Sequence, residues 1–207
     1  NLNFGSGQFS DSSKKLRFTA GQVAPGQYSG TNYKVRAGFQ YLKLSTIAFS
    51  FSISPTLLDF GVVSPNNPIT RTNTLTVSNS SSKGYTVTAS ENNPLKTQGG
   101  LVIPDTTCDN GTCSQISSAA WTNILTYGFG YRCDNLSGTD CETGFIDTTF
   151  YKQFADVSAT ESVQPVMKST VSGTNKQSQI TYKINISGAQ AAGTYSNIIT
   201  YIATPTF

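Results

Sequence analysis

Apolar and polar side chains alternate with a period of two along several stretches of this 207-residue chain. Successive side chains of a strand point to opposite faces, whereas side chains on one face of a helix recur about every 3.6 residues. A two-residue alternation therefore predicts half-buried β-strands and leaves little room for helices. The clearest stretches are Ile47, Phe49, Phe51 and Ile53, and then Ile180, Tyr182, Ile184 and Ile186.

Turn-forming residues separate the alternating stretches. Pro55 ends the first of them, because proline has no N–H to give to a β-ladder. Residues 64–68 and 79–84 are rich in Ser, Asn, Pro and Gly, which is the composition of turns. Short strands spaced about ten residues apart are typical of sandwiches. We therefore predict an all-β fold, an antiparallel Greek-key sandwich of the immunoglobulin-like or jelly-roll-like kind.

The first 43 residues form a strand-rich extension built on a near-repeat. Gly-Gln-Phe-Ser at residues 7–10 returns as Gly-Gln-Tyr-Ser at 26–29. Lys-Leu-Arg at 15–17 returns as Lys-Val-Arg at 34–36. Two copies are too few for a solenoid, so we expect two related strand-and-turn units.

Residues 44–207 are expected to hold the sandwich core, with an irregular cysteine-bearing segment at about residues 92–175. Within that segment, residues 155–176 have the composition of a long polar connection. The last strand is predicted over residues 195–203. Its apolar residues fall on both faces, a pattern that predicts a strand covered on both sides.

The composition favours a neutral exterior rich in hydroxyl and amide groups. Charged residues are 12% of the chain and the formal net charge is +3. Nucleic-acid binding needs a dense basic patch, and only Lys14, Lys15 and Arg17 lie close together here. No apolar run in the sequence approaches the roughly 18 residues that a membrane-spanning helix needs. We therefore predict no nucleic-acid partner and no membrane span in the mature chain.

Four cysteines lie close together in the sequence. A zinc site is disfavoured because the chain has no histidine and no Cys-x-x-Cys pair. Disulfides are expected instead, and two local pairings are the first choice because each brackets a turn, with crossed pairings as the alternative. The local pairs are Cys108 with Cys113 and Cys133 with Cys141.

The expected disulfides also indicate where the protein works. Disulfides form and persist in oxidising compartments. The chain begins with Asn1 rather than methionine. We therefore expect an extracellular or cell-surface protein, exported by a signal peptide that has been removed.

The sequence carries no recognisable catalytic apparatus, and we predict that the protein is not an enzyme. The absence of histidine removes Ser-His-Asp and Cys-His machinery and most catalytic zinc sites. No Gly-x-Ser-x-Gly elbow or phosphate-binding glycine loop occurs. Two carboxylates suffice for a glycosidase, but most carboxylates here sit beside turn residues, where they cap backbone amides. We assign no catalytic residue and no cofactor.

Two binding alternatives stay open. A calcium site would form if the two cysteine loops meet, although the chain has no loop of the EF-hand type. The weak calcium candidates are Asp105, Asp109, Asp134, Asp140 and Glu142. An aromatic platform for a sugar would need Trp121, Tyr127 and Tyr131 on one surface, although a single tryptophan is more often a core anchor.

Short blocks spread over nearly the whole chain carry a family resemblance. They are TNYKVRAGFQ at residues 31–40, LDFG at 58–61, SKGYTV at 82–87, and GTY at 193–195 with YIA at 201–203. With these blocks the chain resembles the secreted β-sandwich surface proteins of uncultured candidate-phyla bacteria, with general similarity to fimbrial, pilin-like and cell-wall sandwich domains. The resemblance implies a surface location and a sandwich fold rather than an activity, and the cysteine-bearing middle lies outside it.

A strand-forming extension ahead of a sandwich predicts assembly. Such a strand can fold back onto its own sheet or add to the edge of a neighbour's sheet, and head-to-tail addition makes a filament. We therefore expect a pilin-like structural subunit of an extracellular filament, a homopolymer of this chain. The expected donor residues, which would fill a groove beside the last strand, are Leu2, Phe4, Leu16 and Phe18. The alternatives are a monomeric surface adhesin or carbohydrate-binding module with a glycan or host-cell ligand, and a secreted hydrolase.

Overall fold

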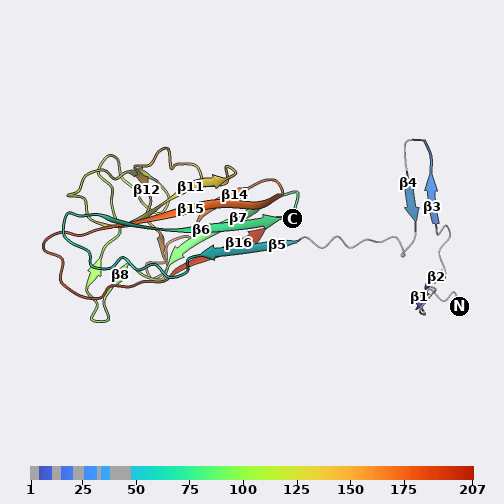
Figure 1. Ribbon diagram of the computed structural model, residues 1–207, viewed down its shortest axis with the longest axis horizontal. Helices are drawn as coiled ribbons and strands as arrows, with labels where there is room; N and C mark the ends of the chain where they lie inside the picture. Colours follow the sequence, from blue (N-terminus) through green and yellow to red (C-terminus); the bar gives the residue numbers. More distant parts are fainter. Residues whose placement is uncertain (1–4, 11–14, 21–25, 32–33, 38–47) are drawn as a thin grey trace. The chain divides into compact units, whose positions relative to one another are not determined.

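The computed structural model describes residues 5–10, 15–20, 26–31, 34–37 and 48–207 (Figure 1). Every regular element in these residues is a strand, as the alternating pattern predicts. None of the described segments forms a helix with the length and apolar character needed to cross a membrane. The chain divides into two compact units, residues 1–46 and residues 47–207, which are described separately below.

The first unit contains two antiparallel hairpins. Strand β1 (Gly5–Ser10) pairs with β2 (Lys15–Ala20), and β3 (Gly26–Ser29) pairs with β4 (Lys34–Ala37). The near-repeat is preserved in the pairing. Phe9 lies opposite Leu16 in the first hairpin, and Tyr28 lies opposite Val35 in the second. Each copy of the repeat therefore folds as one hairpin.

The second unit contains a four-stranded antiparallel sheet. Its strands are β5 (Phe49–Ser54), β6 (Ile69–Asn79), β11 (Gly128–Ser137) and β15 (Gly173–Asn185). The strand order across the sheet is β11, β15, β6, β5, so β5 and β11 are its two edges. The long central strands β6 and β15 pair along almost their whole length (Figure 1).

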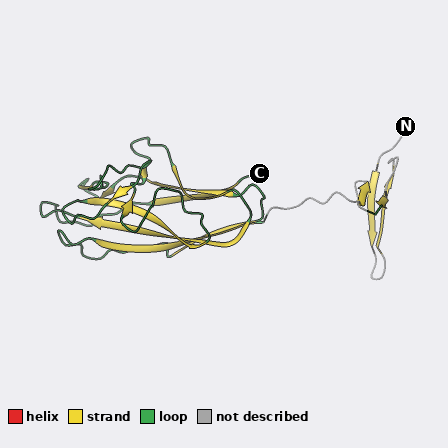
Figure 2. Ribbon diagram, turned by 90° about the horizontal axis from the view of Figure 1, so that it is seen from above, coloured by secondary structure: helices red, strands yellow, loops and turns green. Residues whose placement is uncertain are grey.

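A smaller sheet packs against the first and completes the sandwich (Figure 2). Its central strand is β7 (Tyr85–Glu91), which pairs along one side with β16 (Ile199–Pro205). The other side of β7 pairs with β14 (Gln164–Ser169) in antiparallel fashion and with the short β13 (Ala155–Asp156) in parallel. The edges of this sheet are therefore β16 on one side and β13 with β14 on the other.

The core between the sheets is made by the inward-facing residues that the alternation predicts. Leu75 and Val77 of β6, Ile180 of β15 and Val87 of β7 have no exposed surface. Each such side chain stabilises the fold by about 1.5–3 kcal/mol relative to leaving it exposed. Phe154 also packs into this core from the segment before β13.

A second, smaller cluster is formed by residues of the irregular segment: Cys108, Cys113, Ala119, Trp121 and Tyr151. Short strands accompany it, β10 (Ala119–Ala120) paired with β12 (Phe150–Tyr151), and β8 (Leu95–Lys96) paired with β9 (Val102–Ile103). Lys183 of β15 joins the cluster to the four-stranded sheet. Its Nζ lies 4.4 Å from the Trp121 ring centroid and donates a hydrogen bond to the Trp121 carbonyl at 2.8 Å.

Two of the expectations for the second half of the chain are wrong. Residues 155–176 are no polar connection, because they contain β13, β14 and the start of β15, and Val166 and Met167 are completely buried. The last strand is not covered on both sides. It begins only at Ile199, it is an edge strand, and Ile202 on its outer face is 56% exposed.

Both disulfides join the cysteines in the local pairing, Cys108 with Cys113 and Cys133 with Cys141.

Replacing Cys133 and Cys141 together by alanine is expected to lower the free energy of unfolding by about 2–3 kcal/mol, because a loop of this length is then open in the unfolded chain. Urea unfolding of the double variant beside the parent protein measures the difference. A loss below about 0.5 kcal/mol would contradict the expectation.

Candidate assembly groove

One side of the sandwich is closed by the second disulfide loop. Cys141 is bonded to Cys133 of the edge strand β11. On the other sheet, Glu142 N–H donates to the Val166 carbonyl at 3.0 Å, and Cys141 makes a bridge pair with Met167 of the edge strand β14. The loop therefore spans from one sheet to the other between β11 and β14.

The opposite side of the sandwich is bounded by the remaining two edges, β5 and β16, which run along the same margin in Figure 1. Within residues 48–207, β5 pairs only with β6 and β16 only with β7. The inward side chains of these two strands pack against the core but stay partly exposed: Phe49, Phe51, Ile53, Ile199, Tyr201 and Ala203. We use the name β5/β16 groove for this side, that is, for the two neighbouring strand edges and these six residues.

Some backbone N–H and C=O groups of β16 face away from β7, toward the β5/β16 groove. Thr206 N–H bonds to the Gly84 carbonyl and Asn92 N–H to the Ile198 carbonyl. These bonds fix which residues of β16 exchange hydrogen bonds with β7, because bonded and non-bonded pairs alternate in an antiparallel ladder. Counting from these two bonds, the hydrogen-bonded residues of β16 are the even-numbered ones. Ile199, Tyr201 and Ala203 belong to the non-hydrogen-bonded pairs, so their backbone N–H and C=O groups face away from β7.

The same argument applies to β5. Ser80 N–H bonds to the Ala48 carbonyl, which places Phe49, Phe51 and Ile53 in the phase whose backbone groups face away from β6. Soluble proteins protect such edges with charged residues, prolines or bulges. Neither β5 nor β16 contains a charged residue, and only Pro205 at the end of β16 is a proline. The two edges are therefore open to pairing with another strand.

A chain of polar groups runs from Tyr201 of β16 to Asn73 of β6. The Tyr182 and Tyr201 hydroxyls are 2.7 Å apart, and Asn73 Nδ2 donates to the Tyr182 hydroxyl at 3.0 Å. The Asn73 side-chain oxygen is buried and has no partner. Burial raises the pKa values of Tyr182 and Tyr201 above the usual range, so both hydroxyls remain neutral hydrogen-bonding groups.

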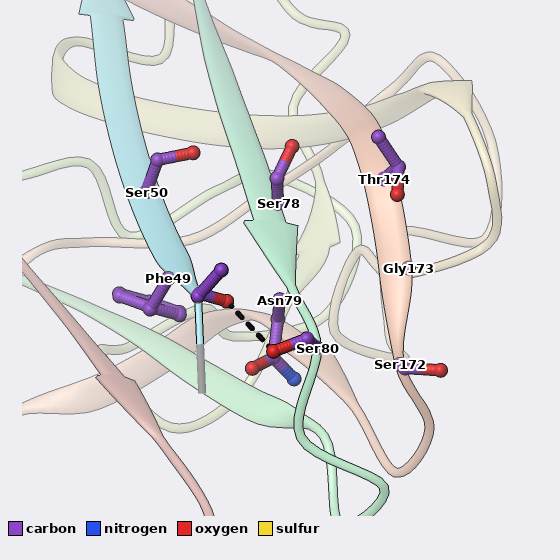
Figure 3. Close-up of a pocket in the computed structure, with 9 residues that line it drawn as sticks. Phe49, Ser50, Ser78, Asn79, Ser80, Ser172, Gly173 and Thr174 are labelled. Carbon is purple, nitrogen blue, oxygen red and sulfur yellow. Dashed lines mark hydrogen bonds between the residues drawn. The ribbon is translucent and has the colours of Figure 1, made fainter. Parts of the chain in front are cut away.

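Phe49, at one end of β5, also lines a surface hollow of about 520 Å³, drawn in Figure 3. The hollow lies where β5, β6 and β15 come together, and small hydroxyl side chains provide most of its lining, including Ser50, Ser78 and Thr174. Ser80 Oγ donates to the Ala48 carbonyl at 3.2 Å. Phe49 is the single aromatic residue in the lining.

The predicted donor residues belong to the first unit. Leu2 and Phe4 lie outside the described residues. Leu16 and Phe18 lie in β2, opposite Phe9 and Gly7 of β1. Among the described residues β2 pairs only with β1, so its other edge is the one through which a further strand would pair.

The structure separates the weak calcium candidates from one another. Asp109 caps the backbone amides of Thr122 and Asn123. The others also contact protein groups: Asp134 pairs with Arg132, Asp140 accepts from Tyr85, Glu142 contacts Thr143, and Asp105 packs beside Glu91. Across the described part of the chain, no group of three potential metal ligands converges. The five candidates therefore do not come together as a set of ligands in the described residues.

The aromatic platform does not form either. Trp121 and Tyr131 are both about 1% exposed and belong to different clusters. Tyr127 is outside both clusters and donates to the Asn66 side-chain oxygen at 2.9 Å. Trp121 therefore has the core-anchor role that a single tryptophan usually has.

Sequence reasoning missed a buried acidic pair at the end of β7. Glu91 has no exposed surface, and its carboxyl group contacts that of Asp105. Nothing in the local sequence marks Glu91 as buried except its place two residues after Ala89 in an alternating strand. The pair forms only because distant segments meet there.

Comparisons of this chain with protein-family models, with curated proteins and with solved structures find no match.

Proposed function

We propose that this protein is a structural subunit of an extracellular assembly, in which a strand from the first unit of one copy adds to the β5/β16 groove of the next. The observation that carries the proposal is the open side of the sandwich. Two uncharged edge strands face it with free backbone groups and partly exposed apolar side chains. An edge of this kind is the usual receptor for strand addition.

The energies of strand addition favour a donor that is already a strand. Each ladder hydrogen bond contributes about 0.5–1.5 kcal/mol net, and each newly buried apolar side chain contributes about 1.5–3 kcal/mol. Ordering a flexible donor would offset these gains by about 1–2 kcal/mol per residue. Strand β2 is already ordered by pairing with β1, so much of that loss is avoided if the hairpin docks as a unit.

The location and the symmetry of the assembly follow from the same features. A donor and an acceptor on different surfaces make a heterologous contact, which propagates head to tail into a filament unless the ring closes. The two disulfides are compatible with an extracellular location. Membership in the surface-protein family of candidate-phyla bacteria, which the sequence resembles, is part of this proposal.

Deleting residues 1–22 is the direct test of the proposed function. The truncated protein is expected to stay monomeric at concentrations where the full chain forms filaments, because its first donor hairpin is missing. Negative-stain microscopy and light scattering measure the difference. Retained polymerisation after the deletion would refute donation by this segment.

A matched pair of double variants separates side-chain donation from charge effects. Leu16→Ser with Phe18→Ser alters one side of β2, and Lys15→Ser with Arg17→Ser alters the other, because successive strand residues alternate. Loss of assembly is expected for the first pair only. Equal loss in both pairs would argue against insertion of the apolar side into the groove.

A second candidate function is supported by the surface hollow that Phe49 lines. Its hydroxyl-rich lining beside Phe49 is suited to a neutral saccharide. The adjoining face of the four-stranded sheet is also uncharged there, with the rows Ser52–Thr76–Gln177 and Ser54–Thr74–Gln179. A carbohydrate-binding adhesin would bind in a glycan array as a stable monomer and would lose that binding on Phe49→Ala, whereas a filament subunit would bind no glycan.

A further inference from the structure

Glu91 is the last residue of β7 and is completely buried. Its Oε2 accepts a hydrogen bond from Asn197 Nδ2 at 2.7 Å. Its Oε1 has no protein donor within reach, and neither has Asp105 Oδ1. The two carboxyl groups are neighbours that act on each other's pKa. Two facing carboxylates accept but cannot donate, so both oxygens stay unpaired until one group takes up a proton.

The other charged groups around the pair are also acidic. Asp156 of β13 lies opposite Glu91 in the parallel ladder, and Glu161 Oε2 accepts from Asp156 N–H at 2.9 Å. In the part of the chain that the structure describes, the only ion pair joins Arg132 to Asp134. The site therefore has several buried or partly buried carboxyl groups and forms no ion pair with the described residues, an arrangement that favours neutral carboxyl groups.

The pKa values shift in the direction that this geometry requires. Burial, and then the charge of Asp105, raise the pKa of Glu91 from 4.5 to about 9. Burial is also the main cause that raises the pKa of Asp105 from 3.8 to about 6. Near neutral pH, Glu91 is therefore protonated and can donate to the Asp105 carboxylate.

The pair lies at the entrance to β16. Glu91 is opposite Ile199, the first residue of that strand, in the β7–β16 register. Asn92 N–H donates to the Ile198 carbonyl at 3.0 Å, and Ile198 N–H donates to Asn92 Oδ1 at 2.8 Å. Together with the Asn197 bond to Glu91, these contacts attach the segment before β16 to the end of β7.

We propose that Glu91 and Asp105 share one proton and that this shared proton holds the start of β16 in place, so that the β16 edge loosens when the proton is lost. We call this proton-dependent attachment of β16 the latch. It depends only on the contacts of Glu91, Asn92 and Asn197. Its consequence, weaker assembly at alkaline pH, rests on the proposed function, because β16 is the acceptor edge in that proposal.

The direction of the pH effect follows from proton linkage. A carboxyl group whose pKa is raised in the folded protein binds more protons there than in the unfolded chain. The stability contributed by Glu91 is therefore fully present below about pH 4.5 and is lost as the pH rises through about 9. Over this range the folding equilibrium constant changes by up to about tenfold per pH unit for one proton.

The test compares the full-length parent protein with Glu91→Gln, under dilute conditions that keep both monomeric. In this variant the amide oxygen can accept from Asn197 and the amide nitrogen can donate to Asp105, which imitates the protonated pair at every pH. Hydrogen-exchange protection factors of Thr200 and Ile202, whose N–H groups face β7, and the Tm are measured from pH 6 to pH 9.5. Asp59→Asn, which keeps the acceptor for Gly61 N–H, is the control.

The parent protein and Asp59→Asn are expected to lose protection at the start of β16 and to show a falling Tm as the pH rises. Glu91→Gln should keep both nearly constant. Parallel pH profiles for the parent and Glu91→Gln would overturn the latch. It would also be overturned if millimolar Ca²⁺ raised the Tm of the parent alone, because the pair would then be a cation site. Filament formation is scored separately: a functional latch without filaments refutes only the assembly, and filaments without a pH-dependent β16 refute only the latch.

Discussion

Replacing Phe154 by alanine is expected to lower the free energy of unfolding by about 3–5 kcal/mol, the range for removing a large aromatic residue from a packed core. Phe154 is 1% exposed and is not part of a regular strand. Its ring stacks on Tyr131 at 4.1 Å between centroids and also contacts Tyr182 at 5.8 Å and Phe129 at 5.9 Å. The three rings surround the Phe154 side chain, so alanine at this position leaves a cavity among them.

The effect of Phe154→Ala is measured by urea or thermal unfolding of the isolated, monomeric protein. Phe207→Ala is the matched control, because Phe207 is 81% exposed and its removal should change the free energy of unfolding by less than about 0.5 kcal/mol. A loss below about 1 kcal/mol for Phe154→Ala would show that packing of the Phe154 ring against its aromatic neighbours does not stabilise the core.

The alternation in the sequence predicted the strands whose inward faces are apolar at every second residue. Ile180, Tyr182 and Ile184 of β15 are all buried, as their period of two predicts. The near-repeat was equally informative, because its two copies became two hairpins with equivalent pairs. These features are local: side chains two residues apart share a face whatever the rest of the fold does.

Predictions failed where the pattern depends on distant contacts. Val166 and Met167 are adjacent and both buried, because the β7–β14 ladder shifts register between Pro165 and Met167 and breaks the alternation. Phe154 gave no periodic signal because it enters the core from an irregular segment. The Glu91–Asp105 contact joins two segments whose meeting depends on the packing of the whole sandwich.

The final strand shows how a correct pattern can support a wrong conclusion. Its apolar residues on both faces predicted a strand covered on both sides, yet Ile198 and Ile202 are 65% and 56% exposed. Within residues 48–207, β16 pairs only with β7, so its other edge lies at the margin of the sheet.

Ala203→Pro is expected to abolish assembly while leaving the monomer folded. The N–H of Ala203 faces away from β7, so proline at this position removes no hydrogen bond of the β7–β16 ladder but deprives an incoming strand of a donor. Pro205 already occupies the same phase two residues later. We expect the free energy of unfolding to change by about 1 kcal/mol or less and filaments to be absent in electron micrographs.

Thr200→Pro is the control of opposite phase. Thr200 is exposed, but its N–H faces Ser90 of β7 in the bonded phase, so proline there breaks the internal ladder and should lower the Tm. If the outer edge of β16 is the interface, Thr200→Pro should therefore impair folding, whereas Ala203→Pro should impair only assembly. If Ala203→Pro keeps the parent Tm and still polymerises, that edge takes no part in the contact between subunits, and β5 alone remains as the acceptor strand.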